Sequence, residues 1–345
     1  MRQGKGGAAA RVLVLLTALA VLAAGCAGPR SAGTVMSEAA ASEAAGQGGS
    51  EAAQGGAGAG AGSEAASEAA PFTPFAVIID NERHARPQSG LDGAAIVVEM
   101  PAEGGITRYF AVFTKDPGTA IGPVRSARIY FNRLAHLWKL PVAHAGGNRD
   151  ALADWRAHAR YDIDGIYTNG AAFYRDSRRK APHNLYTTAA KIEEVLAQRK
   201  LEARAPAVPL GPAAGGEAAS GVEIRFPGGE TVTWRAGADG RWQRETGGRA
   251  ETVEGGTPLA ADDVIVVVAP VRPDPDPWTV GAIDVQWEKA GRAWLLRNGQ
   301  AVAGTMRFTA EGVAFQDADG RPAGLSAGSL WVEVVPAEDD VTILP

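Results

Sequence analysis

The chain has 345 residues and a formal net charge of −5, from 34 Lys and Arg against 39 Asp and Glu. A single cysteine excludes a framework of internal disulfides. The length allows two folded domains of ordinary size in addition to a long N-terminal segment.

Residues 1–25 have the features of a signal peptide. Arg2, Lys5 and Arg11 precede an apolar run of 13 residues, VLVLLTALAVLAA, which is too short to stay in the membrane as a spanning helix. The small residues next to Cys26 resemble a bacterial lipobox, in which the cysteine is acylated and becomes the new N-terminus. We therefore expect a lipoprotein that a palmitate-type anchor at Cys26 holds on the extracytoplasmic face of the cell membrane. An ordinary signal peptide with an incidental cysteine is the alternative.

Residues 26–70 consist mostly of Ala, Gly, Ser, Glu and Gln, with the motif SEAA recurring. Such a segment has too few large apolar side chains to offset the entropy of ordering it, so we expect a disordered tether. A flexible chain of this length would hold the folded part roughly 35 Å from the lipid surface.

Residues 71–205 alternate between strand and helix patterns, which favours an α/β sheet domain. β-branched and aromatic runs predict strands over 75–80, 94–100, 106–114 and 140–147. Apolar spacing predicts helices over 126–139, 150–158 and 187–200. Ser126 is the expected cap of the first of these helices, and Thr187 or Thr188 that of the last.

The segment 206–221 is rich in Pro, Gly and Ala and is the expected linker to a second domain, 222–345. Short alternating runs separated by NG and DG turns make this second domain all-β. Six of the eight tryptophans fall here, and we expect them in the core rather than on a sugar-stacking surface. The predicted fold class is therefore α+β: a mixed α/β sheet domain, then a smaller all-β domain, after a disordered tether.

The charge changes sign between the domains. Residues 72–205 carry 19 Lys and Arg against 14 Asp and Glu, a net of +5, whereas residues 206–345 carry 11 against 20, a net of −9. A basic face suits an anionic membrane or cell wall, and the acidic domain suits docking of another envelope protein. Nucleic acid is not an expected partner of an exported lipoprotein.

Five polar clusters in the first domain lie mostly where predicted strands end: 80–90, 103–108, 122–128, 144–147 and 174–184. Ligands of open sheets bind at strand ends, and guanidinium forks suit phosphate and carboxylate oxygens. We expect these clusters to form one pocket for an anionic ligand. Its candidate binding residues are Arg86, Arg108, Arg125, Ser126, Arg128, Gly146, Gly147, Arg175, Arg178 and Asn184.

Several of these residues have structural alternatives. Arg86 could pair with Asp80, and Arg175 with Asp176, as salt bridges. His144 is about as well explained as a core histidine as by a functional role.

If the protein is an enzyme, the candidate catalytic residues are His183 as general acid or base, Asp176 beside it, and His144. No metal site is assigned, because the spacing of Asp80, His144 and His183 matches no established ligand motif. No cofactor can be named. The usual markers of serine or cysteine nucleophiles are absent from the sequence.

Five ordered motifs resemble those of the YerB-like lipoprotein family, whose domains have no known function. They are FAVIIDNERHARPQSGL, EGGITRYFAVF, IGPVRSARIYF, HAGG and RKAPHNLYT. The resemblance covers residues 75–200 and continues more weakly through the second domain. It implies an exported two-domain lipoprotein and carries over no activity.

The order of the motifs is also similar to that of the LytR-CpsA-Psr phosphotransferases, which transfer wall polymers from polyprenyl-pyrophosphate carriers. Their arginine–aspartate turn would fall on Arg125, but Ser126 follows here. Their arginine-x-aspartate pair has no counterpart around Thr107 and Arg108. This layout keeps arginines for a pyrophosphate and lacks the carboxylates for metal binding and transfer.

The leading hypothesis is therefore a lipoprotein that binds a phosphate-bearing lipid carrier, a wall polymer or a related glycan. Arg125, Arg128, Arg175 and Arg178 would bind the anion, and His183 and Asn184 would complete the pocket. A phosphotransferase or hydrolase acting on envelope polymers is one alternative. A scaffold that binds only other envelope proteins is another.

Overall fold

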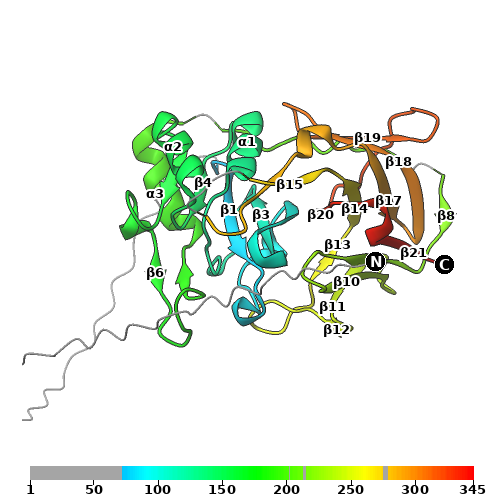
Figure 1. Ribbon diagram of the computed structural model, residues 1–345, viewed down its shortest axis with the longest axis horizontal. Helices are drawn as coiled ribbons and strands as arrows, with labels where there is room; N and C mark the ends of the chain where they lie inside the picture. Colours follow the sequence, from blue (N-terminus) through cyan, green and yellow to red (C-terminus); the bar gives the residue numbers. More distant parts are fainter. Residues whose placement is uncertain (1–71, 202, 213–214, 275–278) are drawn as a thin grey trace, which may run out of the picture. The chain divides into compact units, whose positions relative to one another are not determined.

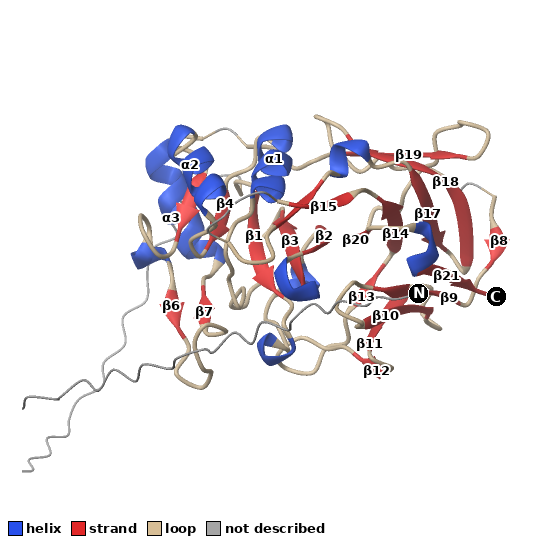
Figure 2. Ribbon diagram, viewed as in Figure 1, coloured by secondary structure: helices blue, strands red, loops and turns tan. Residues whose placement is uncertain are grey.

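The computed structural model describes residues 72–201, 203–212, 215–274 and 279–345. The predicted signal peptide, the predicted acylation site Cys26 and the predicted tether lie outside the described residues. The described part consists of an N-terminal domain with a mixed sheet and few helices and a C-terminal all-β domain, as the sequence predicts (Figure 1). The helices gather over the N-terminal domain, and the rest is almost entirely strand and loop (Figure 2).

The N-terminal domain contributes five strands to the main sheet: β1 (Phe75–Asp80), β2 (Ile96–Pro101), β3 (Thr107–Phe113), β4 (Val142–His144) and β5 (Asp162–Asp164). Its α-helices are α1 (Ile129–Trp138), α2 (Arg149–Ala157) and α3 (Ala189–Arg199). A separate ribbon pairs β6 (Tyr174–Arg175) with β7 (Leu185–Tyr186). Each predicted strand and helix is present with slightly different ends, whereas the short strands β5 to β7 were not predicted.

The C-terminal domain supplies the remaining strands, which are β8 (Glu217–Ala218), β9 (Gly221–Arg225), β10 (Thr231–Ala236), β11 (Trp242–Thr246), β12 (Arg249–Ala250), β13 (Ala260–Ala261), β14 (Asp263–Val268), β15 (Val271–Pro273), β16 (Ile283–Val285), β17 (Arg292–Arg297), β18 (Gln300–Phe308), β19 (Val313–Asp317), β20 (Leu330–Val335) and β21 (Val341–Leu344). Strand β8 falls inside the expected linker and pairs with β18. Short 3-10 turns complete the described elements: η1 (Arg83–Ala85), η2 (Leu91–Gly93), η3 (Glu103–Gly105), η4 (Gly170–Ala172), η5 (Trp287–Lys289) and η6 (Glu338–Asp340).

The two domains share one sheet, which the sequence did not predict. Its strand order is β19-β18-β17-β14-β20-β2-β3-β1-β4-β5, with β8 at β18. The junction is the parallel pairing of β2 with β20, in which Ile96 lies opposite Leu330 and Glu99 opposite Glu333. A second sheet, β12-β11-β10-β9-β21 with β13 on β11, comes entirely from the C-terminal domain.

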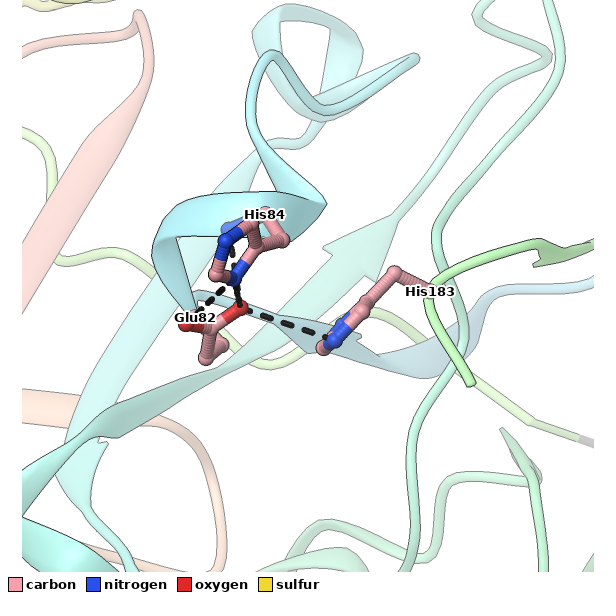
Figure 3. A group of neighbouring side chains, drawn as sticks. All are labelled: Glu82, His84 and His183. Atoms are coloured by element: carbon pink, nitrogen blue, oxygen red, sulfur yellow. Dashed lines mark hydrogen bonds and ion pairs between the residues drawn. The ribbon is translucent and has the colours of Figure 1, made fainter. Parts of the chain in front are cut away.

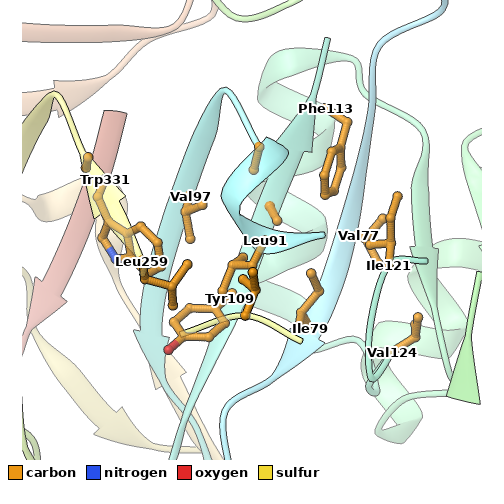
Figure 4. Close-up of a cluster of buried hydrophobic side chains, with 14 of the residues drawn as sticks. Val77, Ile79, Leu91, Val97, Tyr109, Phe113, Ile121, Val124, Leu259 and Trp331 are labelled. Carbon is orange, nitrogen blue, oxygen red and sulfur yellow. The ribbon is translucent and has the colours of Figure 1, made fainter. Parts of the chain in front are cut away.

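Both faces of the main sheet are covered, so every residue of β1 is buried. Successive side chains of a strand point to opposite faces. Phe75, Val77 and Ile79 pack in one core with α3 and the second sheet, whereas Ala76 and Ile78 pack in the other core with α1 and α2. Figure 4 shows the first core, in which Leu259 and Trp331 of the C-terminal domain lie among N-terminal side chains.

The tryptophans of the C-terminal domain that the structure describes are core residues, which confirms the prediction. They are Trp234, Trp242, Trp287, Trp294 and Trp331.

The prediction that Ser126 caps the first helix was wrong. Helix α1 begins at Ile129 with Arg128 at its N-cap position, and no side chain makes the capping hydrogen bond. Ser126 precedes the helix, so its hydroxyl is not placed at the helix terminus.

A buried arginine joins the two sheets at the domain junction. The Nη2 of Arg244 lies 2.7 Å from Oε2 of Glu99, and its Nη1 is bonded to Glu251. Aromatic rings of both domains surround the guanidinium carbon, which is 5.6 Å from the Tyr109 ring centroid and 5.5 Å from that of Trp331. A buried charge is tolerated only with such partners.

We predict that Arg244→Ala lowers the free energy of unfolding by about 3–5 kcal/mol, because it leaves the buried Glu99 without its cation and Glu251 with only the more distant Arg86. Urea unfolding measures the change. The matched control is Arg235→Ala on the neighbouring strand, whose side chain is 52% exposed in its pair with Glu245 and should cost about 0–1 kcal/mol. Equal losses in the two variants would contradict the role assigned to Arg244.

Glu333 makes stability depend on pH. Burial, and after it the charge of Glu99, raises the pKa of Glu333 well above its ordinary value of 4.5. The folded state then keeps a proton that the unfolded state releases, so the free energy of unfolding falls as pH rises from the unfolded pKa toward the folded one. Each pH unit in this window costs at most about 1.4 kcal/mol.

We predict that Glu333→Gln, which imitates the protonated side chain, loses less stability than the wild type between about pH 5 and about pH 8. Glu338→Gln is the control, because Glu338 is 54% exposed in its pair with Arg292. The measurement is the difference in unfolding free energy between the two pH values. Identical pH dependence in wild type and Glu333→Gln would show that Glu333 is ionised in the fold.

Candidate functional site

The carboxyl end of β1 meets two other segments of the N-terminal domain. The amide of Asp80 donates to the carbonyl of Pro123 at 2.9 Å, and the amide of Val124 donates to the carbonyl of Leu185 at 2.7 Å. The segment 121–125 therefore runs between β1 and β7. Side chains from all three segments meet at the point where β1 ends.

Asp80 is the centre of this group. Its carboxylate is fully buried, with Oδ2 2.7 Å from Nδ1 of His183 and 3.0 Å from Nε of Arg125. Its Oδ1 accepts a hydrogen bond of 3.0 Å from the amide of Glu82. One buried carboxylate thus fixes an imidazole, a guanidinium and the turn that follows β1.

Glu82 and His84 lie on that turn and face His183 (Figure 3). An oxygen of Glu82 is 2.9 Å from Nδ1 of His84 and 3.5 Å from Nε2 of His183. Partial burial raises the pKa of Glu82, but hydrogen bonds from His84 and the charges of both histidines lower it by more. The carboxylate is therefore held in its ionised form between two imidazoles.

The hydrogen bonds set the chemistry open to His183. In the neutral tautomer whose Nδ1 donates to Asp80, Nε2 is unprotonated and lies 3.5 Å from the Glu82 carboxylate. Such an Nε2 can accept a proton or bind a metal ion.

Three arginines lie beside this group, of which Arg108 faces Asp80 in the pairing of β1 with β3. Arg108 lies 3.4 Å from the carboxylate of Glu103, which also binds Arg128. The Nε atom of Arg108 has no hydrogen-bond partner among the described residues. Burial, and after it the charge of Arg128 and that of Arg125, lowers the pKa of Arg108 to about 10. Arg108 and Arg128 thus share the carboxylate of Glu103, whereas Arg125 pairs with Asp80.

Asn81 connects the site to the domain junction. Its Nδ2 donates to Oε1 of Glu99 at 3.0 Å, and Glu99 is the carboxylate that binds Arg244. Its Oδ1 accepts from Nε of Arg86 at 2.8 Å.

Arg86 does not form the salt bridge with Asp80 that the sequence suggested. Its guanidinium binds Glu230 of the C-terminal domain, with Nη2 2.6 Å from Oε2, and lies 3.7 Å from Glu251. Arg86 therefore joins the domains.

Four predicted residues of the 174–184 hairpin bind one another or the C-terminal domain. Arg178 is 73% exposed, 2.7 Å from Asp176 and 3.4 Å from Glu254. Arg175 donates to Oδ1 of Asn184 at 2.7 Å.

The suggested pairing of Asp176 with His183 was therefore wrong, because the Asp176 carboxylate turns back to Arg178. The suggested Arg175–Asp176 bridge is likewise replaced by the bond to Asn184. Neither Arg175 nor Arg178 forms a contact with Asp80 or His183 in the described structure.

His144 has the role of a core histidine. It is fully buried, with Nε2 2.7 Å from Asp162 and Nδ1 2.9 Å from the carbonyl of Gly146, so neither nitrogen is open to a substrate. Gly146 has φ +64 and accepts a hydrogen bond from the amide of Ala127, and a Cβ on Gly147 would lie 3.2 Å from the Ala127 carbonyl oxygen. Gly146 and Gly147 thus let the segment after β4 approach the backbone of Ala127 closely.

Sequence reasoning named His183 and Arg125 but missed Glu82 and His84. The signal was the stretch DNERH, in which Asp80 ends a buried strand and Glu82 and His84 follow at alternate positions. Hydrogen bonds of the following turn bring these residues together.

Two groups among the described residues bring together side chains that can ligate a metal. One is Glu82, His84 and His183; the other is His136, Asp154 and His158, on α1 and the end of α2.

Two family profiles match this architecture. The N-terminal domain of a protein of unknown function (DUF3048) matches residues 61–202, and its C-terminal domain matches residues 222–332. The chain belongs to the DUF3048 family. The family resemblance predicted from the five motifs is thereby confirmed.

The DUF3048 chain is 29% identical over 281 residues to "Putative lipoprotein YerB" of Bacillus subtilis (strain 168), an alignment covering 78% of this chain and 83% of that protein. The crystal structure of YerB from Bacillus subtilis has a similar fold, with a TM-score of 0.70 at 27% identity, over 80% of this chain and 99% of the other. Within the part of the DUF3048 chain that is described, no helix has the length and apolar character needed to cross a bilayer.

We predict that Glu103→Gln lowers the free energy of unfolding by about 1–3 kcal/mol at neutral pH, because it leaves Arg108 and Arg128 without their shared carboxylate. Burial raises the pKa of Glu103, but the hydrogen bond from Arg128 and the charges of both arginines bring it below the ordinary value. The contribution is therefore present above the unfolded pKa and lost as pH falls through the folded one.

The measurement is urea unfolding of wild type and Glu103→Gln at neutral and acidic pH. Glu245→Gln, in a surface pair with Arg235, is the control and should cost about 0–1 kcal/mol. A difference that persists unchanged in acid would contradict an ionised Glu103.

Proposed function

We propose that this DUF3048 protein is a lipoprotein, anchored through Cys26 on the extracytoplasmic side of the cell membrane, that binds a phosphate-bearing ligand of the cell envelope beside Arg125. The anchor is supported by the charged and apolar N-terminal pattern that ends at Cys26. The name of its Bacillus subtilis relative, which describes a lipoprotein, supports it further.

The observation that carries the ligand proposal is the crowding of positive charge at the end of β1. Three guanidinium groups, of Arg108, Arg125 and Arg128, share the two carboxylates of Asp80 and Glu103. The lowered pKa of Arg108 follows from burial and from the repulsion of its two arginine neighbours. A phosphate group nearby would relieve this repulsion.

Arg125 is the arginine of the three that a ligand reaches most easily. Its side chain is 21% exposed, against 10% for Arg128 and 4% for Arg108. A guanidinium has five N–H donors, so Arg125 can keep its ion pair with Asp80 while its donors bind phosphate oxygens. Because Asp80 also fixes His183, the imidazole lies beside the same ligand.

The test is thermal unfolding of the full chain with and without farnesyl pyrophosphate. A ligand at about 100 times its dissociation constant stabilises the folded state by about 2.7 kcal/mol. We expect this stabilisation in the wild type and its loss in Arg125→Gln.

The matched control is Arg178→Gln, because Arg178 is an exposed arginine that pairs with Asp176 and does not contact Asp80. It should keep the full stabilisation. No stabilisation of the wild type, or equal loss in the two variants, would contradict a site beside Arg125.

A further inference from the structure

We propose that Glu82, His84 and His183 form a binding site for a divalent transition metal ion, with zinc the ion best suited to two imidazoles and one carboxylate. This inference goes beyond the phosphate-bearing ligand and stands on its own geometry.

The donor atoms already have nearly the spacing that zinc requires. All three lie within 4.8 Å of one another, and the Glu82 carboxylate is 2.9 Å from Nδ1 of His84 and 3.5 Å from Nε2 of His183. Tetrahedral zinc with bonds of about 2.0–2.1 Å separates its ligand atoms by roughly 3.3 Å. An ion therefore fits with small rotations of side chains that are not locked in a core.

The contacts behind His183 are of the kind that orients a metal-binding histidine. A ligating imidazole usually donates its other N–H to a carboxylate, which fixes the ring and its tautomer. His183 does so through Nδ1 to Asp80, and the buried Asp80 is in turn held by Arg125. This arrangement aims Nε2 of His183 at the Glu82 carboxylate.

The ligand turn is fixed in the same way. The backbone amide of Glu82 donates to Asp80, and the backbone amide of His84 donates to Glu82 at 2.8 Å. The turn is thus shaped by hydrogen bonds to its own residues and to the buried Asp80.

The site is open to solvent on the side of His84, whose side chain is 63% exposed, against 17% for His183. An ion can therefore enter, and three protein ligands leave a fourth position for water or another ligand, as in zinc sites that act on substrates. Coordination by Nε2 also removes the lone pair with which His183 would accept a proton.

The second group of potential ligands, His136, Asp154 and His158, lacks these features. Nδ1 of His158, the C-cap residue of α2, is 3.0 Å from the backbone carbonyl of Asp154. No buried carboxylate of the described residues orients either imidazole from behind. We assign the metal to the first group for this reason.

The test is calorimetric titration of the full chain with zinc sulfate after dialysis against a chelator. We expect one zinc ion per chain, with affinity reduced at least about 10-fold in His84→Ala and in Glu82→Gln. Both side chains are partly exposed, so these variants should fold, which circular dichroism checks. His158→Ala is the matched control and should bind as the wild type does.

Absence of zinc binding by the wild type would overturn the proposal. So would binding that His84→Ala leaves unchanged, or binding that only His158→Ala weakens, which would place the ion at the second group. No phosphate-bearing compound is present in this titration, and no metal is added in the farnesyl pyrophosphate test. Failure of one proposal is therefore distinguishable from failure of the other.

Discussion

The sheet that the two domains share depends on the pairing of β2 with β20, which joins the strands of one domain to those of the other. This pairing places the glutamates Glu99 and Glu333 opposite each other in the interior, where two like charges repel strongly. Arg244 reaches this point from the second sheet and binds Glu99, while burial keeps Glu333 protonated at pH values where exposed glutamates are ionised. One cation and one retained proton thus relieve the repulsion between Glu99 and Glu333 where the central strands of the two domains meet.

Part of the opposite net charge of the two domains is neutralised by ion pairs between them. Basic residues of the N-terminal domain pair with acidic residues of the C-terminal domain in several places. These pairs are Arg86 with Glu230, Arg133 with Asp284 and Glu288, and Arg178 and Arg179 with Glu254. Arg125 differs from them, because its acidic partner Asp80 belongs to its own domain and also holds His183.

The local elements were predictable from the sequence because each has its own periodicity. The strand over 75–80 and the helix over 187–200 are present nearly as predicted, since alternating or helical apolar spacing is a property of a few neighbouring residues. The junction was not predictable in this way. Strands β2 and β20 lie far apart in the chain, and the local sequence of a strand does not indicate which distant strand it pairs with.

The site was predictable only in part, for a related reason. Arg125 and His183 could be named from the residue types that gather at strand ends. Asp176 was chosen as the partner of His183 because it is near in sequence, but its carboxylate binds the amide and side chain of Arg178 two residues later. The true partner, Asp80, comes from β1, and the turn η1 that presents His84 is too short to leave a periodic signal.

Asp80 and Asn81 are consecutive, yet their side chains serve different parts of the protein. Asp80 holds the imidazole and guanidinium of the site, whereas Asn81 holds Glu99 at the junction. Neighbouring Cα atoms are about 3.8 Å apart across a planar peptide that barely twists. A single peptide unit therefore separates the residue that positions His183 from the residue that binds Glu99 at the junction. The candidate site and the domain junction are thus built on two consecutive residues.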